Sequence, residues 1–268
     1  MRQALNLSLG QRDNVTFLLH GNYGTGKTFL LGDMLQTEGQ NGPVRYLNIK
    51  GEDGYDSVKG LGLETLNETF PPVVLEPPTK EPPKPRFMAD TVETLADYKE
   101  VIKEYRGVKG LRAVGIDGGP MLYNLLIRDL FGDAMPEKFE WGKVRFHGTN
   151  LFTELHYLAP IVMMTSSSDR SSDPTSANPL ANQLTTPNFY GWMSTGIAGL
   201  FSFVFVMKSR VIGVGKIQRV LLTAPLEGVV VRYRTPKPLP AEIDIPEGPG
   251  GWKKVWDIIN ATYTEVKK

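Results

Sequence analysis

The sequence of 268 residues contains no cysteine and only three histidines. The absence of cysteine excludes disulfide bonds and thiolate metal ligands, and the scattered histidines lack the spacing of a zinc site. No hydrophobic run approaches the length of a membrane-spanning helix, and the first residues, Met1–Leu5, lack the apolar segment of a signal peptide. We therefore expect a cytoplasmic protein with no membrane partner.

The chain also lacks an excess of charge of either sign. It carries 30 lysines and arginines against 29 aspartates and glutamates, a formal net charge of +1, which gives no general indication of nucleic-acid binding. The hydrophobic content of 41% and the charged content of 22% are ordinary for a globular protein. The length is sufficient for one α/β domain with insertions and a sizeable core.

The most informative stretch is Gly21–Thr28, which has the pattern G-x-x-x-x-G-K-[ST]. It follows the apolar run Val15–Leu19 and precedes the amphipathic run Phe29–Leu35, so a strand and a helix flank it, as this motif requires. Glycines let successive N–H groups point at an anion, and the helix N-terminus adds its free amides. The sequence therefore predicts a nucleoside triphosphate site formed by Gly21, Asn22, Tyr23, Gly24, Thr25, Gly26, Lys27, Thr28 and Phe29.

Two further features complete the expected site for ATP and Mg²⁺. Lys27 can reach the β- and γ-phosphates, and the hydroxyl of Thr28 can bind the metal ion. The apolar segment Leu111–Asp117 is predicted to be a strand that ends in an aspartate. A carboxylate in this position, opposite the phosphate loop, holds a water of the Mg²⁺ shell. We therefore expect Thr28 and Asp117 to hold the metal.

Hydrophobic periodicity predicts the remaining elements. The expected helices are Lys27–Glu38, Thr91–Arg106 with Asp90 as its N-cap, Met121–Phe131, about Val144–Leu158, and Trp252–Val266. The expected strands are Val44–Ile49, Ala159–Met164, Gly199–Met207, and a hairpin pair of Lys216–Thr223 with Gly228–Tyr233. Early alternation followed by consecutive strands predicts a mainly parallel α/β sheet with an antiparallel C-terminal extension.

We expect residues 1–240 to form one domain and residues 241–268 to form a tail and a helix that packs on it. Seven prolines between Pro71 and Pro85 exclude a helix or an internal strand there. The stretch 71–86 is therefore predicted to be an extended insertion, either a stiff connector or a polyproline segment that binds a partner. Trp252 and Trp256 are expected to dock the closing helix on the core.

These ordered features resemble the phage-encoded RecA-like P-loop ATPases, the small Sak-type recombination proteins. The resemblance covers roughly residues 14–240, and only the phosphate loop in it is a specific motif. Its other parts are Lys50-Gly51-Glu52, Gly115–Gly118, Trp141 ahead of a helix, Thr165-Ser166 and Arg219–Thr223. The resemblance implies a RecA core, Mg²⁺-dependent ATP hydrolysis and assembly into a ring or filament. It also implies action on single-stranded DNA during phage recombination or replication, with a phage single-strand-binding or replication partner, in the host cytoplasm.

The chain departs from the RecA pattern at the residue that positions the attacking water. RecA-like proteins usually have a glutamate at the end of the second strand, where this sequence has Lys50. Glu52 is the nearest carboxylate that can replace it, and Asp53 is the next. If neither side chain reaches the γ-phosphate, hydrolysis will be slow or will need a partner.

Five further residues are candidates for contact with the γ-phosphate. Thr165 and Ser166 end a predicted strand and either sense this phosphate or are ordinary turn hydroxyls. Arg170 lies in the polar stretch 167–186, a predicted loop, and is a candidate arginine finger toward a neighbouring subunit, with a solvated surface role as the alternative. Lys208 and Arg210 compete with it for that contact.

The segment 206–237 is strongly basic, with seven cations and a single acid, Glu227. Such a surface suits a phosphate backbone, and Tyr233 can stack a base. The alternative is a solvated sheet face that prevents edge-to-edge aggregation. The candidate DNA-binding residues are Lys208, Arg210, Lys216, Arg219, Arg232 and Arg234.

Two other functions remain open at this point. A DNA-packaging motor ATPase shares the phosphate loop, although the chain leaves no room for a nuclease domain. A nucleotide-switched binding protein, such as a helicase loader, would bind ATP with little hydrolysis, which the lysine at position 50 favours.

Overall fold

The structure is a computed structural model that describes residues 14–51, 54–70, 85–172, 183–190, 192–224 and 229–264, without the side chains of 169–172, 183–185 and 264. The predicted proline-rich insertion lies almost entirely outside the described residues. No described helix is both long enough and apolar enough to cross a membrane.

The described strands form one sheet of nine, in the order β3-β2-β4-β5-β1-β7-β8-β9, with β6 paired to β5. The strands are β1 (Val15–Gly21), β2 (Val44–Ile49), β3 (Phe87–Val92), β4 (Ala113–Asp117), β5 (Ile161–Ser172), β6 (Gln183–Pro187), β7 (Phe203–Gly213), β8 (Lys216–Leu222) and β9 (Glu242–Ile245). The first six in the sheet order are parallel, and β8 and β9 are added antiparallel. This arrangement confirms the predicted parallel sheet with an antiparallel extension.

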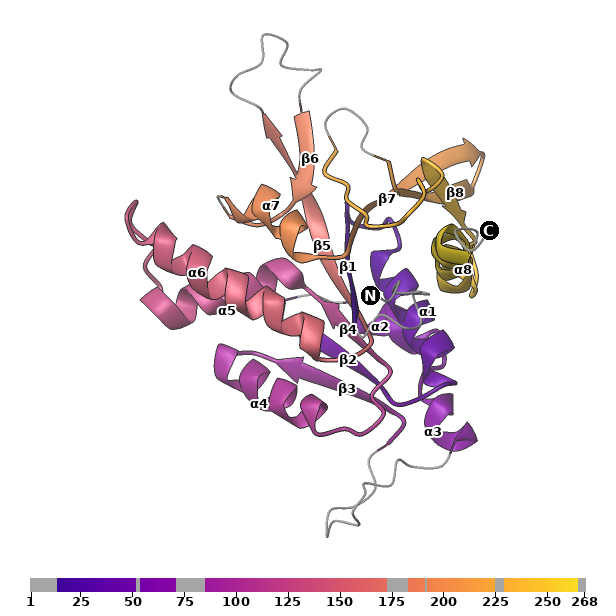
Figure 1. Cartoon of the computed structure of the whole chain (residues 1–268), viewed down its shortest axis with the longest axis horizontal. Coiled ribbons are helices and arrows are strands. Elements are labelled where there is room, and N and C mark those ends of the chain that lie inside the picture. Colours follow the sequence, from indigo (N-terminus) through magenta and orange to yellow (C-terminus); the bar gives the residue numbers. More distant parts are fainter. Residues whose placement is uncertain are drawn as a thin grey trace, which may run out of the picture.

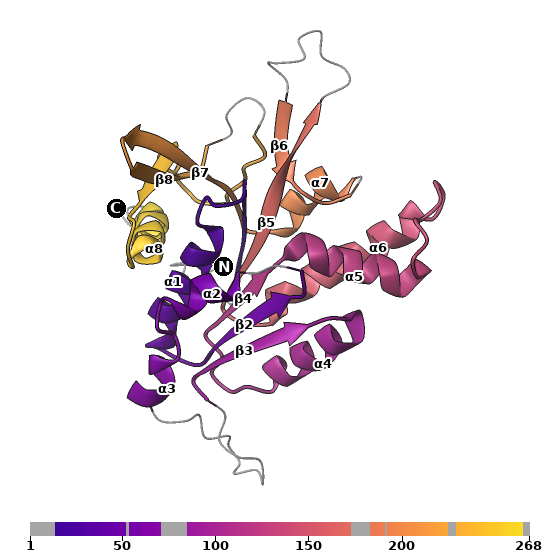
Figure 2. The same ribbon diagram turned by 180° about the vertical axis from the view of Figure 1, so that it is seen from behind.

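Helices cover both faces of the sheet (Figures 1 and 2). They are α1 (Lys27–Gly39), α2 (Tyr55–Lys59), α3 (Thr65–Thr69), α4 (Leu95–Arg106), α5 (Gly119–Phe131), α6 (Trp141–Thr153), α7 (Met193–Gly196) and α8 (Gly251–Thr264), with 3₁₀ turns at Glu154–Tyr157 and Ile197–Leu200. The first three and α8 pack on one face, and α4, α5 and α6 pack on the other. The doubly covered sheet explains why β1 and β4 are buried along their whole length.

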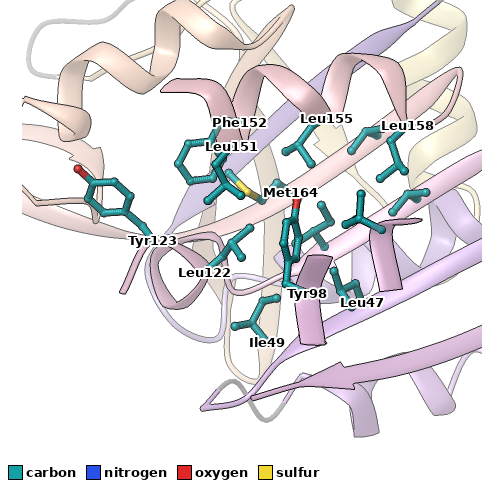
Figure 3. Packing of buried hydrophobic residues seen from close by; sticks show 14 of the residues in the cluster. Leu47, Ile49, Tyr98, Leu122, Tyr123, Leu151, Phe152, Leu155, Leu158 and Met164 are labelled. Atoms are coloured by element: carbon teal, nitrogen blue, oxygen red, sulfur yellow. The ribbon is translucent and has the colours of Figure 1, made fainter. Parts of the chain in front are cut away.

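Two hydrophobic cores hold these layers together. On the α4–α6 side, Leu47 and Ile49 of β2 pack against Tyr98, Leu122 and residues of α6, as Figure 3 shows. On the other side, the fully buried Trp252 of α8 meets the ring of Phe17 of β1 edge-on, with centroids 5.2 Å apart. The indole N–H of Trp252 also donates to Glu38 Oε1 at 3.2 Å, so α8 is docked on α1 and the sheet.

The central position of β1 determines where the site forms. It pairs with β5 on one side and β7 on the other, both parallel. The carboxyl ends of β1, β2, β4 and β5 therefore meet at the same edge of the sheet. Ligands bind outside this edge in open α/β sheets.

The helix predicted over Thr91–Arg106 begins later than expected. Residues 87–92 form β3, because they pair in parallel with β2. The helix begins at Leu95 after a capping box, in which the Thr94 hydroxyl accepts from the Asp97 N–H at 3.1 Å and the Thr94 N–H donates to the Asp97 carboxylate at 3.0 Å. Asp90 is therefore a strand residue, and its carboxylate accepts the hydroxyl of Tyr105 at 2.6 Å.

The predicted C-terminal hairpin was also wrong in its pairing. β8 pairs with β7 across the turn at 214–215, because β7 continues to Gly213, six residues past its predicted end. In residues 229–233 an isolated bridge joins Arg232 to Val204. The stretch expected to be a loop after Met164 begins as an extension of β5 to Ser172, and the helix expected from Val144 is α6, which begins at Trp141.

Candidate functional site

A cavity of about 580 Å³ opens at the carboxyl edge of the sheet. It is formed by the phosphate loop, the start of α1, the segment between β2 and α2, the ends of β4 and β5, and one residue of β8. Its lining residues are Tyr23, Gly24, Gly26, Lys27, Thr28, Phe29, Gly51, Gly54, Ser57, Asp117, Thr165, Ser166, Ser167 and Arg219. Segments that are up to 196 residues apart in the sequence therefore share one pocket.

The phosphate loop has the conformation that anion binding needs. Gly26 has a φ of 93°, in the left-handed region that favours glycine, and α1 begins at the next residue. The Thr25 hydroxyl donates to the carbonyl of Asn22 at 2.9 Å, and Lys27 Nζ donates to the carbonyls of Gly21 and Asn22 at 3.0 and 2.8 Å. The lysine ammonium thus lies across the loop, beside the free amides at the N-terminus of α1.

Asp117 is the centre of a buried network of hydroxyl groups. Its Oδ2 accepts hydrogen bonds from the hydroxyls of Thr28 and Tyr46, each at 3.0 Å. Its Oδ1 accepts the hydroxyl of Thr165, and the Thr165 oxygen in turn accepts the N–H of Gly118 at 3.2 Å. The carboxylate is only 2% exposed, so these donors fix its position. The predicted pair Thr28 and Asp117 therefore lies within hydrogen-bonding distance.

Two residues of this network were missed by the sequence analysis. Tyr46 is a fully buried strand residue, and its pattern is that of a core aromatic, so no local signal indicates its contact with Asp117. Gly54 lies against Asp117 and Thr28: a Cβ at this position would be 1.9 Å from Asp117 Oδ2 and 2.9 Å from Thr28 Cγ2. Its position in the charged loop after β2 is the only sequence signal for a role in the site.

The strand-end hydroxyls are engaged with the protein itself. Thr165 binds Asp117 and Gly118, and the Ser166 hydroxyl donates to the carbonyl of Ser167 at 2.7 Å. Both line the cavity, but Thr165 is arranged to position Asp117. The backbone of Arg170 lies in β5, paired with Thr185 of β6, and its side chain is outside the described residues.

The two candidates for the water-positioning residue, Glu52 and Asp53, lie outside the described residues. Lys50 does not line the cavity. Its ammonium pairs with Glu93 at 2.6 Å, and both side chains are more than half exposed. Among the described lining residues, Asp117 is the only carboxylate.

The six cations predicted to bind DNA are not equivalent. Lys208, Lys216 and Arg234 are exposed, and Arg210 is exposed but pairs with Glu242. Arg232 is half-buried and donates to the carbonyl of Ala198 at 3.1 Å, and burial lowers its pKa. Arg219 lines the cavity, with its guanidinium carbon 5.5 Å from the ring centroid of Phe29.

His20 fixes the strand end that leads into the phosphate loop. The fully buried ring donates from Nε2 to the carbonyl of Val230 at 2.8 Å, so its Nδ1 accepts the Ser168 hydroxyl at 2.9 Å. Burial lowers the pKa of His20 to about 4, the Val230 contact opposes this, and the charge of Lys27 adds to it. The ring is therefore neutral at physiological pH.

Comparisons with known proteins identify the fold. No protein-family model matches the chain, and no curated protein matches its sequence. A crystal structure of a KaiC-like protein from the archaeon Pyrococcus horikoshii is similar over 88% of this chain and 86% of that one, with a TM-score of 0.51 and 12% identity. A crystal structure of the flagellar accessory protein FlaH from Methanocaldococcus jannaschii is similar over the same fractions of the two chains, 88% and 86%, with a TM-score of 0.45 and 14% identity. With the strand order and the antiparallel extension, the first similarity identifies the fold of this chain as RecA-like.

Proposed function

We propose that this protein binds Mg²⁺ and ATP in the cavity above β1, β4 and β5, and that it hydrolyses the nucleotide. One observation carries the proposal: the Thr28 hydroxyl and the Asp117 carboxylate are 3.0 Å apart, beside a phosphate loop whose lysine lies across the free amides. Lys27 would neutralise charge that develops on the transferred phosphate. The loop amides and the start of α1 would hold the phosphate chain.

The donors in the cavity suit Mg²⁺ better than other metals. Mg²⁺ prefers oxygen ligands and is commonly held by one or two protein groups together with substrate phosphates and water. Thr28 and Asp117 supply such oxygens, and the described residues contain no cluster of three or more histidine, aspartate or glutamate side chains for a dedicated metal cage. When bound, the metal would neutralise phosphate charge, while Tyr46 and Thr165 keep Asp117 in place.

Hydrolysis requires a group that orients water, and here the proposal depends on Glu52. Asp117 is occupied by the hydroxyl network, and Lys50 pairs with Glu93 outside the cavity. This arrangement also favours a second candidate, a nucleotide-switched binding protein that releases phosphate slowly. Lys208, Arg210 or Arg170 of a neighbouring copy would then be the candidates to complete the site in a ring or filament.

Action on single-stranded DNA in phage recombination stays a prediction. It is supported by the sequence resemblance and by the exposed cations Lys208, Lys216 and Arg234. Arg210 pairs with Glu242, Arg232 donates to Ala198, and Arg219 lines the cavity, so the basic surface is smaller than the sequence indicated.

The test is ATP hydrolysis by the purified protein alone, with single-stranded DNA and with duplex DNA, beside Lys27→Ala and Glu52→Ala variants. Stimulation by single strands that both substitutions abolish supports the recombination function. Stimulation by duplex alone favours the packaging motor. Tight ATP binding without turnover in any condition favours the nucleotide switch, and failure to bind ATP refutes the proposal.

A further inference from the structure

Arg219 reaches the phosphate loop from the antiparallel extension of the sheet. It lies on β8, and its guanidinium carbon is 5.5 Å from the ring centroid of Phe29 in the first turn of α1. Its Nε is 2.8 Å from the point where a Cβ on Gly26 would lie. A side chain at position 26 would therefore require Arg219 to move, so the Arg219 side chain lies close to Gly26.

The other arginines of this part of the sheet already have partners. Arg210 pairs with Glu242, and Arg232 donates to Ala198. Arg219 contacts the Phe29 ring instead, and within the part of the chain that the structure describes no carboxylate forms an ion pair with it. A guanidinium has five N–H donors, so this side chain keeps donor capacity at a cavity whose expected ligand is an anion.

The position of Arg219 along the loop indicates which part of the nucleotide it meets. In a phosphate loop, the backbone amides hold the α- and β-phosphates and the lysine reaches the β- and γ-phosphates. Gly26 and Phe29 flank Lys27 and Thr28 on the side of the loop and helix amides. Arg219 lies beside Gly26 and the Phe29 ring, and the amides of this part of the loop are among those expected to hold the α- and β-phosphates.

We propose that Arg219 is a nucleotide-binding residue of the same chain, whose guanidinium binds the α-phosphate end of ATP or ADP. The inference rests on the proposed function. Contact with the Phe29 ring orients the guanidinium, and the planar group can donate two hydrogen bonds to phosphate oxygens, which a lysine cannot do in the same geometry. The antiparallel extension would in this way become part of the nucleotide site.

The experiment measures equilibrium binding of ATP, of ADP and of single-stranded DNA to the full chain and to the variants Arg219→Ala, Arg219→Lys, Gln218→Ala and Lys27→Ala. Removing charge-assisted hydrogen bonds predicts about 10- to 100-fold weaker binding of both nucleotides by Arg219→Ala, with Arg219→Lys in between. The matched control is Gln218→Ala, which changes the adjacent strand residue that bonds Asp244 at 2.8 Å and should bind both nucleotides normally.

Three outcomes overturn the inference. If Arg219→Ala binds ATP and ADP as tightly as the wild type or more tightly, the Arg219 side chain does not contribute to nucleotide binding or hinders it. A loss confined to ATP would place the contact at the γ-phosphate. Normal nucleotide binding with weakened binding of single-stranded DNA would return Arg219 to its predicted DNA role. If the wild-type chain binds neither nucleotide, both the proposed function and the inference about Arg219 fail. If the wild-type chain binds normally and only Lys27→Ala weakens binding, the inference about Arg219 alone is refuted.

Discussion

The substitution Gly54→Ala tests whether Asp117 and Thr28 form a metal site that tolerates no side chain beside it. Gly54 has an ordinary backbone conformation, with a φ of −73°, so alanine introduces no backbone strain. The effect must come from the new methyl group, which would lie 1.9 Å from Asp117 Oδ2.

The magnitude follows from the contacts of that oxygen. The shortest tolerable Cβ contact is 3.0 Å, so Oδ2 has to move by about 1 Å. Such a movement breaks or lengthens the 3.0 Å bonds from Thr28 and Tyr46. Overpacking of this kind lowers the free energy of unfolding by about 1–3 kcal/mol. Disturbing the residues that hold a metal ligand in place typically lowers metal affinity about 10- to 100-fold.

The assay compares calorimetric binding of ATP in the presence of Mg²⁺ and in the presence of EDTA. We expect Gly54→Ala to lose affinity for Mg²⁺-ATP by this factor and to keep most of its affinity for metal-free ATP, because the atoms nearest to the new methyl group belong to Asp117 and the Thr28 side chain and not to Lys27 or the glycines of the phosphate loop. The control is Gly60→Ala, at the end of the same short helix, where a Cβ would meet nothing closer than 3.8 Å. Normal Mg²⁺-ATP binding by Gly54→Ala, with an unfolding free energy within about 0.5 kcal/mol of wild type, would refute the reasoning.

Three other predictions concern groups around the site. Tyr46→Phe keeps the ring packed on Tyr55, with centroids 5.7 Å apart, but removes a donor to Asp117. Urea denaturation should therefore show that the free energy of unfolding falls by about 1–2 kcal/mol, and an unchanged midpoint would contradict this prediction. Thr165→Val leaves the buried N–H of Gly118 without its acceptor, so we expect the free energy of unfolding to fall by about 1–3 kcal/mol and ATP turnover to slow. Full activity of this isosteric variant would exclude a positioning role for Thr165. The pKa of His20 lies near 4 in the folded chain and near 6.5 when unfolded, so the unfolded state binds the extra proton between these values and stability should fall by about 2 kcal/mol from pH 7 to pH 4.5. His20→Gln should lose this part of the pH dependence, and an equal slope in both proteins would show that other groups cause it.

The sequence predicted the parallel core and the main anchors of the site because both depend on short-range patterns. A phosphate loop needs only consecutive residues, and Asp117 follows a buried apolar run of ordinary strand length. Parallel pairing then brings the ends of such strands to one edge without further information. The predictions of Lys27, Thr28 and Asp117 as neighbours therefore needed no knowledge of tertiary contacts.

What the sequence could not predict depends on register and on contacts between distant segments. Residues 87–92 have little hydrophobic alternation, and they form β3 because the edge of β2 is available. The tip of the β7–β8 hairpin contains glycines and exposed apolar residues such as Val211 and Ile212, so its extent is set by pairing and not by burial. Arg219 looks like one cation of a basic strand until the pairing of β8 with β7 places it above the phosphate loop.

The site therefore divides into two parts that the fold holds in different ways. Asp117 and Thr28 are held by the sheet and by hydroxyl donors from β2 and β5, and Lys27 is held by carbonyls of the phosphate loop. The carboxylate proposed to orient water belongs to the segment after β2, which begins with Lys50, the partner of Glu93. Because separate elements carry the two functions, Glu52→Ala should abolish turnover without loss of ATP affinity, and Lys27→Ala should lose both. A Glu52→Ala variant that binds ATP as weakly as Lys27→Ala would show that binding and hydrolysis are not separable in this way.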